Sequence, residues 1–432
     1  MITVKFGGTS LADAARYRHA AQIVRADTRR RYVVVSAPGK RHPEDIKITD
    51  LLIRFHNSRN SADFEPIEER FRQIVRELGL ELDLSSDFDE MKNRPHNLDY
   101  MTSCGEYLSA RIMAAYLGWP FVDAEECVFF DEDGQLNARK TESAIFERLK
   151  DLPSAVLPGF YGVLPNGEIH TFSRGGSDIS GALVARAMEC EVYENWTDVD
   201  GMLVTDPRIV PQAASIGTIT YAELRELAYQ GAAVLHEDSV LPVREMGIPI
   251  HICNTFRPQA PGSWIMAKAD AAPRPITGIA GRKGYSTILI ERENTNSIVG
   301  YVRRILSCLE QRQIPFEHMA TGLGSVSLVV PTAAIKDCRE QLEREIRRAV
   351  RPDSIQITDG LAMIAVVGRG MVDRPGVSSR LFGAVAAAGI SVRVIDQGCS
   401  EMNIVIGVRE EQYEAAVRAV YNRFFDGETP VK

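Results

Sequence analysis

The sequence predicts an α/β protein, in which a three-layer domain with a mainly parallel central sheet precedes two copies of a smaller βαββ unit. Two observations support this fold class. In the first 256 residues, short runs of β-branched residues alternate with helical patterns, which is the order of elements in a parallel sheet. Beyond residue 275, Gly300 and Ile314 recur as Gly376 and Ile390, at a spacing of 76 without a gap.

We expect a catalytic domain over residues 1–256, a linker over residues 257–275, a first βαββ unit over residues 276–352 and a second over residues 353–432. The linker contains four prolines, which favours an irregular segment. A βαββ unit of this size cannot bury a large core alone. The two units should therefore pack against each other, exchange strands, or pack against another subunit.

The apolar patterns of the first domain predict its elements in order. Strands are expected over residues 2–6, 32–35, 155–160, 192–196 and 248–252, the last being the final strand of the domain. Helices are expected over residues 11–24, 102–117, 179–187 and 221–230, with a helical hairpin within residues 49–92. Several strands are followed by polar or glycine-rich loops, and ligands collect at the carboxyl ends of such strands.

Composition excludes several classes of function. The formal net charge is −8, which argues against a general nucleic-acid surface. No apolar run is long enough to span a membrane, and the first ten residues lack the pattern of a signal peptide. The seven cysteines contain no C-x-x-C pair, which disfavours a zinc site and a disulfide framework. We expect a reduced, soluble, cytoplasmic protein with no nucleic-acid or membrane partner, and no metal held by its own side chains.

Polar residues near the expected strand ends predict an anion site. Lys5 lies inside the first strand, and a buried lysine is costly unless it meets an anion. The alternative is an edge strand whose lysine points to solvent. Gly7 and Gly8 follow this strand, and a second glycine loop runs from Arg174 to Asp178 before a helix. Backbone N–H groups in such loops can contact an anion.

The remaining polar positions favour phosphoryl transfer. No Walker sequence G-x-x-x-x-G-K-[ST] is present, and the dinucleotide fingerprint that begins at Gly368 has Asp373 in place of its third glycine. Two facing donor-rich loops suit in-line phosphoryl transfer, in which catalysis is mainly positioning and charge neutralisation. Glu106 is expected in the first turn of its helix, where it either complements the helix dipole or presents a carboxylate to a substrate ammonium group.

Five motifs, in this order, resemble those of aspartate kinases. They are VKFGGTS at residues 4–10, VVVSAPGK with KITDLL at residues 33–40 and 47–52, Cys104-Gly105-Glu106, FSRGGSD at residues 172–178, and TDVDG with TDPRIV at residues 197–201 and 205–210. The repeated units resemble the tandem ACT domains of the same family, and RPGVSSRLFGAVAAAGISV and SEMNIVI are typical of the second ACT domain. The resemblance covers the whole chain.

The resemblance implies an amino-acid-kinase fold and the transfer of a phosphoryl group from ATP to L-aspartate, giving 4-phospho-L-aspartate and ADP. This reaction is the first step of lysine, threonine and methionine biosynthesis. The residues implied for catalysis are Lys5, Arg174 and Asp178. Those implied for aspartate binding are Ser36, Thr49, Glu106, Arg174 and Ser177. Those implied for ATP are Lys5, Phe6, Gly7, Gly8, Thr197, Asp198, Leu203, Arg208, Ala233 and Val234, with Mg²⁺ bound mainly through the nucleotide.

The chemistry of these residues fits the implied roles. Lys5 would neutralise charge on the transferring phosphoryl group, and Arg174 would bind the α-carboxylate of aspartate in a bidentate manner. Glu106 would bind the α-ammonium group, and Asp178 would fix either that group or Lys5. Ser36 and Thr49 would orient the attacking side chain. That side chain is already ionised at neutral pH because its pKa is about 4, so no general base is needed.

Two positions depart from the family pattern on the nucleotide side. Many members have a lysine where Ala233 stands, and often a tyrosine where Leu203 stands. A charge-assisted hydrogen bond contributes about 1.5 to 3 kcal/mol, so we expect ATP to bind roughly ten- to a hundredfold more weakly unless another cation substitutes.

ACT domains in this family bind feedback amino acids at subunit interfaces. The resemblance therefore implies lysine, threonine or both as effectors, and a homodimer or larger homo-oligomer. The implied effector residues are Ser297, Ile298, Val299, Gly300, Tyr301, Thr321, Ser325 and Ser327. The alternative is that the ACT units only dimerise the enzyme.

Two other functions stay open at this point. One is a kinase for another small amino acid, although those relatives lack tandem ACT units. The other is an amino-acid-sensing regulator with a weakened kinase domain, which the alanine at position 233 suggests. We expect no fused homoserine dehydrogenase, because the sequence given ends soon after the second unit.

Overall fold

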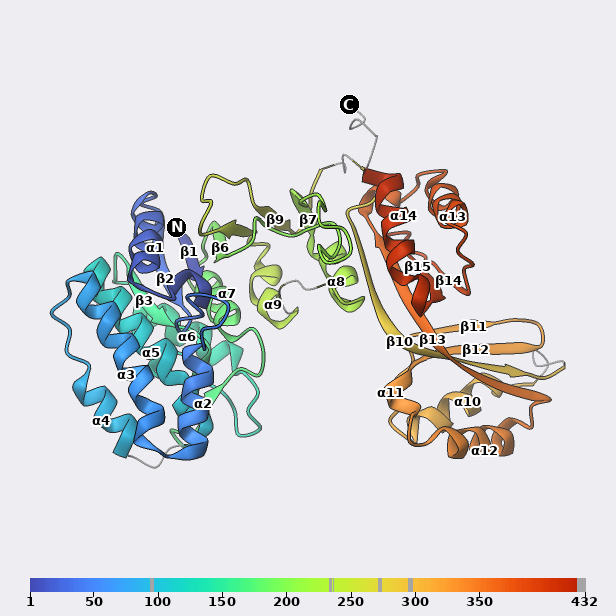
Figure 1. Ribbon diagram of the computed structural model, residues 1–432, viewed down its shortest axis with the longest axis horizontal. Helices are drawn as coiled ribbons and strands as arrows, with labels where there is room; N and C mark the ends of the chain where they lie inside the picture. Colours follow the sequence, from blue (N-terminus) through green and yellow to red (C-terminus); the bar gives the residue numbers. More distant parts are fainter. Residues whose placement is uncertain (94–96, 233–234, 236, 271–273, 294–297, 426–432) are drawn as a thin grey trace. The chain divides into compact units, whose positions relative to one another are not determined.

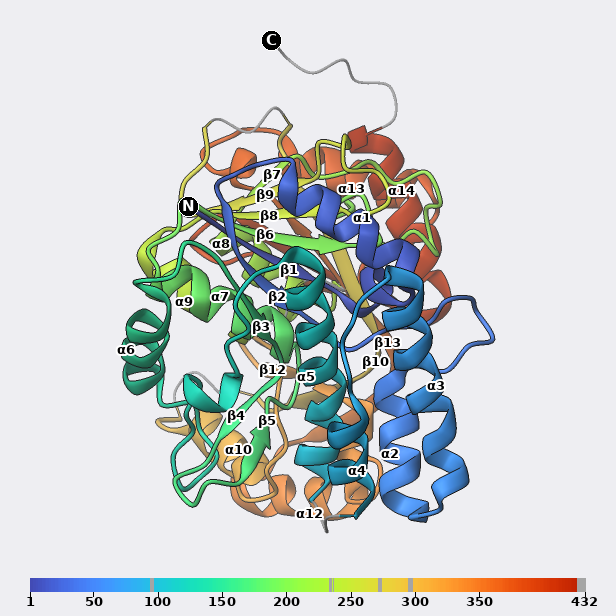
Figure 2. The same cartoon turned by 90° about the vertical axis from the view of Figure 1, so that its left-hand side faces the viewer.

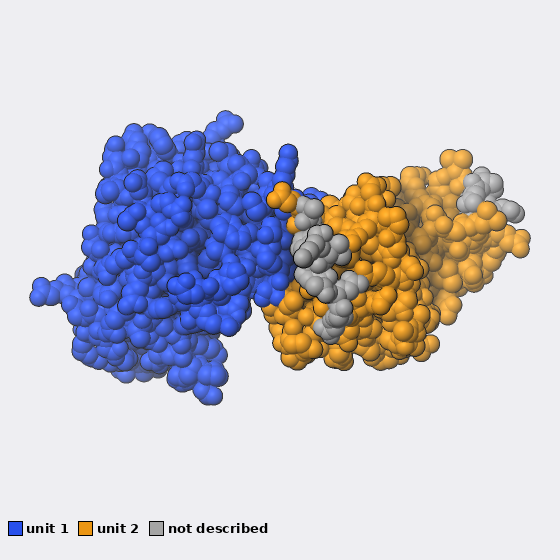
Figure 3. Space-filling model, turned by 90° about the horizontal axis from the view of Figure 1, so that it is seen from above, with its two compact units in different colours: residues 1–202, 215–225, 234–269 blue, residues 203–214, 226–233, 270–432 orange. Residues whose placement is uncertain are grey.

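The computed structural model describes residues 1–93, 97–232, 235, 237–270, 274–293 and 298–425 (Figure 1). The chain forms two compact units, which Figure 3 distinguishes by colour. The first comprises residues 1–202, 215–225 and 234–269, and the second comprises residues 203–214, 226–233 and 270–432. Two short segments of the expected catalytic domain, residues 203–214 and 226–233, therefore belong to the second unit, which the sequence did not lead us to expect.

The first unit is built around a seven-stranded sheet with the strand order β3-β2-β1-β6-β8-β9-β7 (Figure 2). Its strands are β1 (Ile2–Phe6), β2 (Arg30–Val35), β3 (Ala155–Pro158), β6 (Val192–Thr197), β7 (Thr218–Thr220), β8 (Ile250–Asn254) and β9 (Ser263–Met266). Strands from β3 to β8 in this order pair in parallel, whereas β9 pairs antiparallel with β8 and parallel with β7. The mainly parallel sheet confirms the predicted fold class.

Helices cover both faces of this sheet and give it three layers. Ile2, Val4 and Phe6 of β1 share an apolar core with the helices α1 to α5, which lie side by side in Figures 1 and 2. Alternate residues of a strand point to opposite faces, so Thr3 and Lys5 point to the other face, on which α7 packs. The helices are α1 (Ala14–Arg25), α2 (Ile48–Ser58), α3 (Ser61–Leu78), α4 (Ser85–Asn93), α5 (Leu98–Leu117), α6 (Ala138–Leu149), α7 (Gly176–Ala187) and α9 (Glu237–Met246), together with the first residues of α8 (Tyr221–Tyr229), which continues into the second unit. Shorter elements are the 3₁₀ turns η1 (Gly8–Leu11) and η2 (Ala124–Glu126), and the hairpin of β4 (Tyr161–Val163) and β5 (Ile169–Thr171).

Two helical predictions in this unit need correction. The first helix begins at Ala14 rather than residue 11, because Asp13 accepts a hydrogen bond from the Arg16 N–H and residues 8–11 form η1 instead. Residues 49–92 hold parts of three helices rather than a hairpin of two. Arg59 ends α2 in the left-handed conformation, with a φ of 53°, and Asn60 then caps α3.

Two further predictions missed an element boundary. The helix that carries Glu106 begins at Leu98, because Asn97 accepts a hydrogen bond from the Tyr100 N–H. Glu106 therefore lies more than two turns inside α5, and the helix-dipole interpretation of this residue is wrong. The expected linker at residues 257–275 contains β9, so β8 is not the last strand of the sheet.

The second unit contains a six-stranded sheet with the order β11-β12-β10-β13-β15-β14 (Figure 1). Two strands of 14 residues, β10 (Gly278–Glu291) and β13 (Ser354–Val367), pair antiparallel at its centre. The other strands are β11 (His318–Thr321), β12 (Ser325–Pro331), β14 (Val394–Asp396) and β15 (Asn403–Arg409). The helices are α10 (Tyr301–Glu310), α11 (Thr332–Ile335), α12 (Arg339–Val350), α13 (Val377–Ala387) and α14 (Tyr413–Phe425), with 3₁₀ turns η4 (Arg369–Met371) and η5 (Glu410–Gln412).

The internal repeat is present in the structure at the predicted spacing. Gly300 and Gly376 are the N-caps of α10 and α13, with φ angles of 74° and 86° that favour glycine. Ile314 and Ile390 are both buried shortly after these helices. Each copy also ends in a further helix, α12 or α14, so the unit is βαββα rather than βαββ. Within the described part of the chain, no helix is long and apolar enough to cross a membrane.

Candidate active site

The centre of the first sheet is a topological switch point. The chain passes from β1 to β2 and β3 on one side, and from β6 to β8 on the other. Loops at the carboxyl ends of adjacent parallel strands diverge at such a point and leave a crevice in which ligands bind. Three of the predicted segments lie at these ends: Gly7 and Gly8 after β1, Ser36 after β2, and Thr197 with Asp198 at the end of β6.

Lys5 lies in the middle of this arrangement. Its strand is flanked by β2 and β6, so the alternative of an edge-strand lysine in solvent is wrong. The Lys5 Nζ lies 2.5 Å from Asp178 Oδ1 and 3.5 Å from Asn195 Oδ1. The Asn195 amide also donates to Asp178 Oδ1 at 2.9 Å. The ammonium group, whose side chain is only 10% exposed, is therefore held by a carboxylate and an amide from two different elements.

The N-terminus of α7 brings Asp178 to Lys5. Gly175 caps this helix with a φ of 60°, and the Asp178 N–H donates to its carbonyl at 2.9 Å. Tyr193 of β6 donates its hydroxyl to the Asp178 carbonyl at 3.0 Å. A Cβ on Gly176 would lie 2.7 Å from the ring of Phe160, so this helix end packs closely on the turn after β3. Asp178 was expected to fix either Lys5 or the substrate ammonium group, and in the structure it binds Lys5.

Two loops meet through glycine backbone beside this group. The Gly39 N–H donates to the Gly8 carbonyl at 2.8 Å. A Cβ on Gly8 would lie 2.7 Å from the Ala37 carbonyl oxygen, and a Cβ on Gly39 would lie 2.7 Å from the Gly8 carbonyl carbon. Both positions therefore need glycine so that the loop after β1 can contact the loop after β2.

Glu106 is buried in α5, next to the loop after β2. A Cβ on Gly105 would lie 2.7 Å from the Ala37 Cβ, which shows how closely the helix approaches that loop. Burial raises the pKa of Glu106 from 4.5 to about 8, although a backbone hydrogen bond involving Ala37 and the charge of Lys5 oppose this rise. Glu106 Oε2 has no hydrogen-bond partner among the described residues. Such an atom indicates a carboxyl group that a ligand can engage.

The other predicted substrate residues differ in exposure. Arg174 is exposed immediately before α7, and no hydrogen bond or ion pair joins it to another described residue. Ser177 is half-buried in the first turn of α7, where a Cβ on Gly159 would meet its side chain. Ser36 is half-buried after β2, and its carbonyl accepts a hydrogen bond from the Ser109 hydroxyl at 2.8 Å. Thr49 is half-buried in the first turn of α2.

The predicted nucleotide residues are distributed over both units. Thr197 and Asp198 are in the first unit, where the threonine hydroxyl lies 3.2 Å from Asp198 Oδ1. The Phe6 side chain is fully buried and its ring stacks on Trp196, so only its backbone is available to a ligand. Leu203 and Arg208 belong to the second unit, and Arg208 pairs with Asp206 on the surface. Ala233 and Val234 lie outside the described residues.

Asn195 is a site residue that the sequence analysis missed. It stands opposite Lys5 in the β1–β6 register and is buried, as is its neighbour Glu194. Glu194 accepts two hydrogen bonds from Arg30, so that polar residue has a structural partner. The signal available in the sequence was a pair of polar residues inside an otherwise apolar strand, because buried polar groups need partners.

The predicted effector residues lie in the second unit. Gly300 and Tyr301 begin α10, where Val299 is 94% exposed, Ile298 is half-buried and the buried Tyr301 hydroxyl has no partner among the described residues. Tyr301 shares an apolar cluster with residues of β12, including Val326. Ser325 and Ser327 are half-buried on that strand, and Thr321 is exposed on β11. Ser297 lies outside the described residues.

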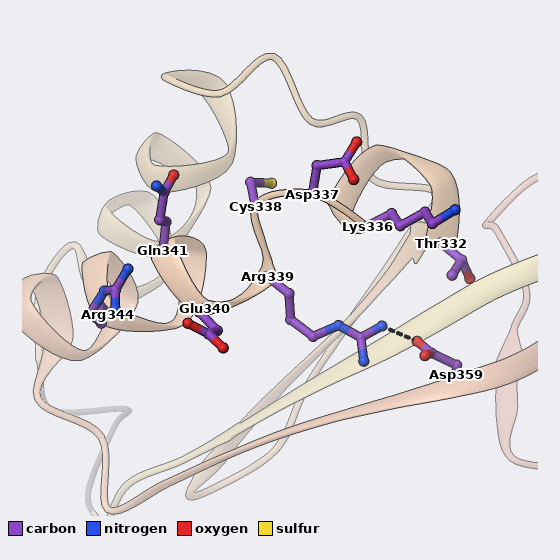
Figure 4. A pocket seen from close by; sticks show the side chains of 9 residues that line it. All are labelled: Thr332, Lys336, Asp337, Cys338, Arg339, Glu340, Gln341, Arg344 and Asp359. Atoms are coloured by element: carbon purple, nitrogen blue, oxygen red, sulfur yellow. Dashed lines mark hydrogen bonds and ion pairs between the residues drawn. The ribbon is translucent and has the colours of Figure 1, made fainter.

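The second unit also has a surface cavity of about 640 Å³ at the start of α12 (Figure 4). No predicted site residue lines it. Its walls carry three basic and three acidic side chains, and Arg339 pairs with Asp359 across it. Ser286 and Thr332 complete a hydrogen-bonded network with Asp359. Because these charges balance and the network is satisfied, the cavity provides no net charge for a ligand.

A buried lysine beside glycine loops at the switch point of a parallel sheet fits a kinase for small molecules, the class that the motifs predict. Residues 1–254 match the model of the Amino acid kinase family, and residues 364–424 match that of the ACT domain. Aspartokinase 3 of Bacillus subtilis is 33% identical over 450 residues, which cover 99% of each chain. The chain belongs to the aspartokinase family. It is an ATP-dependent aspartate kinase with ACT regulatory domains, as the five motifs predict.

Solved structures agree with this assignment. The aspartate kinase of Clostridium acetobutylicum superposes with a TM-score of 0.90 and 41% identity, over 98% of this chain and 100% of that one. Aspartokinase III of Escherichia coli, in complex with lysine and aspartate, superposes with a TM-score of 0.70 and 25% identity, over 99% of this chain and 100% of that one. The comparisons thus favour an aspartate kinase over a kinase for another small amino acid and over an amino-acid-sensing regulator with a weakened kinase domain.

Replacing Glu106 by glutamine should change how stability depends on pH. The pKa of Glu106 is raised in the folded state, so the folded protein retains a proton between about pH 4.5 and pH 8 that the unfolded chain has lost. The wild-type protein therefore loses stability as pH rises through this window, by a few kcal/mol. The neutral Glu106→Gln variant does not. Between about pH 5 and about pH 8, the Tm of the wild type should fall relative to that of the variant by on the order of 5 °C. Parallel Tm curves would show that Glu106 is ionised in the folded protein.

Proposed function

We propose that this aspartate kinase transfers the γ-phosphoryl group at the carboxyl ends of β1 and β6, with Lys5 as the cation that stabilises the transferred group. The single observation that carries this proposal is the burial of Lys5 in a central strand, where Asp178 and Asn195 hold its ammonium group. A fixed cation at this place needs no reorganisation as negative charge shifts between oxygens. N–H groups of Gly7 and Gly8 would bind the same phosphates.

The reaction requires little proton chemistry. An oxygen of the aspartate side chain, ionised at neutral pH, attacks the γ-phosphorus, the bond to the β-phosphate oxygen breaks, and ADP leaves. No proton needs to be removed from the nucleophile. The protein therefore contributes positioning and charge neutralisation rather than a general base. Asp178, which is bound to Lys5, would act by holding the lysine.

Two oppositely charged groups would recognise the amino-acid part of aspartate. Arg174 is exposed and unpaired among the described residues, which leaves its planar guanidinium available for the α-carboxylate. Glu106 Oε2 lacks a partner and would accept the α-ammonium group. The hydroxyl groups of Ser36, Thr49 and Ser177 would donate hydrogen bonds to the attacking carboxylate.

On the nucleotide side, Thr197 and Asp198 would bind ATP from the end of β6. The other ATP residues implied by the resemblance to aspartate kinases, Leu203, Arg208, Ala233 and Val234, remain predictions. Mg²⁺ would be held mainly by the phosphates, and would neutralise their charge during transfer. The exposed Asp198 carboxylate would offer one additional oxygen of the kind that this ion prefers.

Regulation forms the second part of the proposal. The ACT units would bind lysine, threonine or both near the N-terminus of α10 and on β12, and would join chains into a homodimer or larger oligomer. Aspartokinase III of Escherichia coli was crystallised with lysine and aspartate, which supports lysine as a candidate. If the ACT units only dimerise the enzyme, neither amino acid will inhibit it.

All seven cysteines are described and are free thiols, which supports a cytoplasmic location.

Trapping the acyl phosphate with hydroxylamine tests the activity directly. The purified enzyme with ATP, magnesium and aspartate should give aspartyl hydroxamate, whereas glutamate and N-acetylglutamate should give none. Lysine and threonine, added singly and together, should lower the rate if the regulatory proposal holds. No hydroxamate at millimolar aspartate would contradict the kinase assignment.

Arg174→Ala should raise the KM for aspartate by about 10- to 100-fold, because a bidentate charge-assisted contact contributes about 1.5 to 3 kcal/mol. The KM for ATP should change by less than about threefold, since the clamp would not contact the nucleotide. Arg139→Ala is a matched control, because Arg139 is exposed on α6. A larger effect on the KM for ATP than on that for aspartate would refute the clamp.

A further inference from the structure

Arg16 of α1 bridges two loops of the first unit through backbone carbonyl groups. Its Nη1 donates to the Thr9 carbonyl and to the Lys40 carbonyl, both at 2.9 Å, and its Nη2 donates to the Arg41 carbonyl at 3.0 Å. Thr9 belongs to the loop after β1, and Lys40 and Arg41 belong to the loop after β2. One guanidinium group therefore binds both loops at once.

The helix itself fixes the side chain of Arg16. Asp13, the N-cap of α1, accepts a hydrogen bond from the Arg16 N–H, and its Oδ2 lies 3.4 Å from Arg16 Nε. The guanidinium also lies over the ring of Phe256, at 5.4 Å from the centroid. The side chain is 23% exposed, so its charge is partly shielded from water. A planar fork of five donors can serve three carbonyls in a fixed geometry, which a lysine cannot reproduce.

The far side of the loop after β2 is fixed by a second group of charges. Arg70 of α3, with only 5% of its side chain exposed, donates to the Gly39 carbonyl at 3.3 Å and to Asp45 Oδ1 at 2.8 Å. Asp45 also accepts three hydrogen bonds from Arg41. Although burial opposes it, these bonds and the charge of Arg70 hold the pKa of Asp45 well below its usual value. The loop is thus anchored to α3. Arg16 and the close contacts of Ala37 and Gly39 with Gly8 join it to the loop after β1.

We infer that Arg16 is a positioning residue for phosphoryl transfer, which sets the distance between the loop bearing Gly7 and Gly8 and the loop that starts at Ser36. This inference rests on the proposed function, in which the first loop binds phosphate and the second orients the attacking carboxylate. Arg16 touches neither reactant. Its effect follows from geometry, because a displacement of about 1 Å between reacting groups lowers the rate by about a hundredfold.

Removing the bridge should lower kcat and leave ground-state binding nearly intact. For Arg16→Ala, we expect kcat to fall by about 10- to 100-fold, and for Arg16→Lys to recover part of this loss. The KM for aspartate and the Kd for ADP should change by less than about threefold. Arg18→Ala is the matched control, because Arg18 lies on the same helix, is exposed and donates to the Glu77 carbonyl of α3.

A second measurement separates positioning from a general loss of folded enzyme. In a mixture of ADP, magnesium, aspartate and aluminium fluoride, the aluminium fluoride stands in for the transferring phosphoryl group. The affinity of the enzyme for this transition-state analogue, measured by calorimetry, should fall in Arg16→Ala by about the same factor as kcat. A smaller folded fraction would lower the number of sites without changing this affinity.

Wild-type kcat and wild-type analogue affinity in both Arg16 variants would overturn the inference, and so would a loss of kcat with unchanged analogue affinity. If Arg16→Ala does not fold, Arg16→Lys alone decides between these outcomes. An inactive wild-type enzyme would instead contradict the proposed function, so the two failures are distinguishable.

Discussion

The ion pair between Lys5 and Asp178 is the interaction on which the rest of the site depends. An ammonium group inside a central strand is stable only if a partner satisfies it, since an unpaired buried charge costs several kcal/mol. Asp178 is available because α7 begins where Gly175 turns the chain, and Asn195 is available because β6 pairs with β1 in register. The positions of a helix, a strand and a glycine loop are therefore linked through one ammonium group.

The site also presents different charged groups to the phosphates of ATP and to the aspartate substrate. Lys5 is fixed and charged, Arg174 is exposed and unpaired among described residues, and burial keeps Glu106 mostly protonated near neutral pH. In the proposed mechanism, the ammonium group of bound aspartate would lower the pKa of Glu106, because an opposite charge favours the ionised carboxylate, and the proton of Glu106 would be released to solvent. Substrate binding and ionisation of Glu106 would then be coupled, whereas the cation that stabilises the phosphoryl group stays in place.

The fold class, the burial of Lys5 and the repeat of the second unit could be predicted from the sequence, because each follows from a local pattern. Gly300 and Gly376 mark the repeat, since both cap a helix in a conformation that favours glycine. The sequence left two roles open for Asp178, binding Lys5 or binding the substrate ammonium group. It could not decide between them, because strand register and helix position depend on the tertiary structure. Asn195 was missed for the same reason, and the start of α5 was misplaced because Asn97 caps it a full turn before the apolar pattern begins.

The role of Lys5 is the central claim, and Lys5→Met tests it most directly. To avoid an unpaired buried carboxylate, the variant is combined with Asp178→Asn and compared with the wild type, because Asp178→Asn alone would leave the buried ammonium group without its carboxylate. We predict that the double variant loses about a thousandfold in kcat relative to the wild type, since one preorganised charge in the transition state contributes about that much. Its Kd for aspartate, measured by calorimetry, should stay within about threefold. Retention of kcat within about tenfold would contradict the claim that Lys5 stabilises the transferred phosphoryl group.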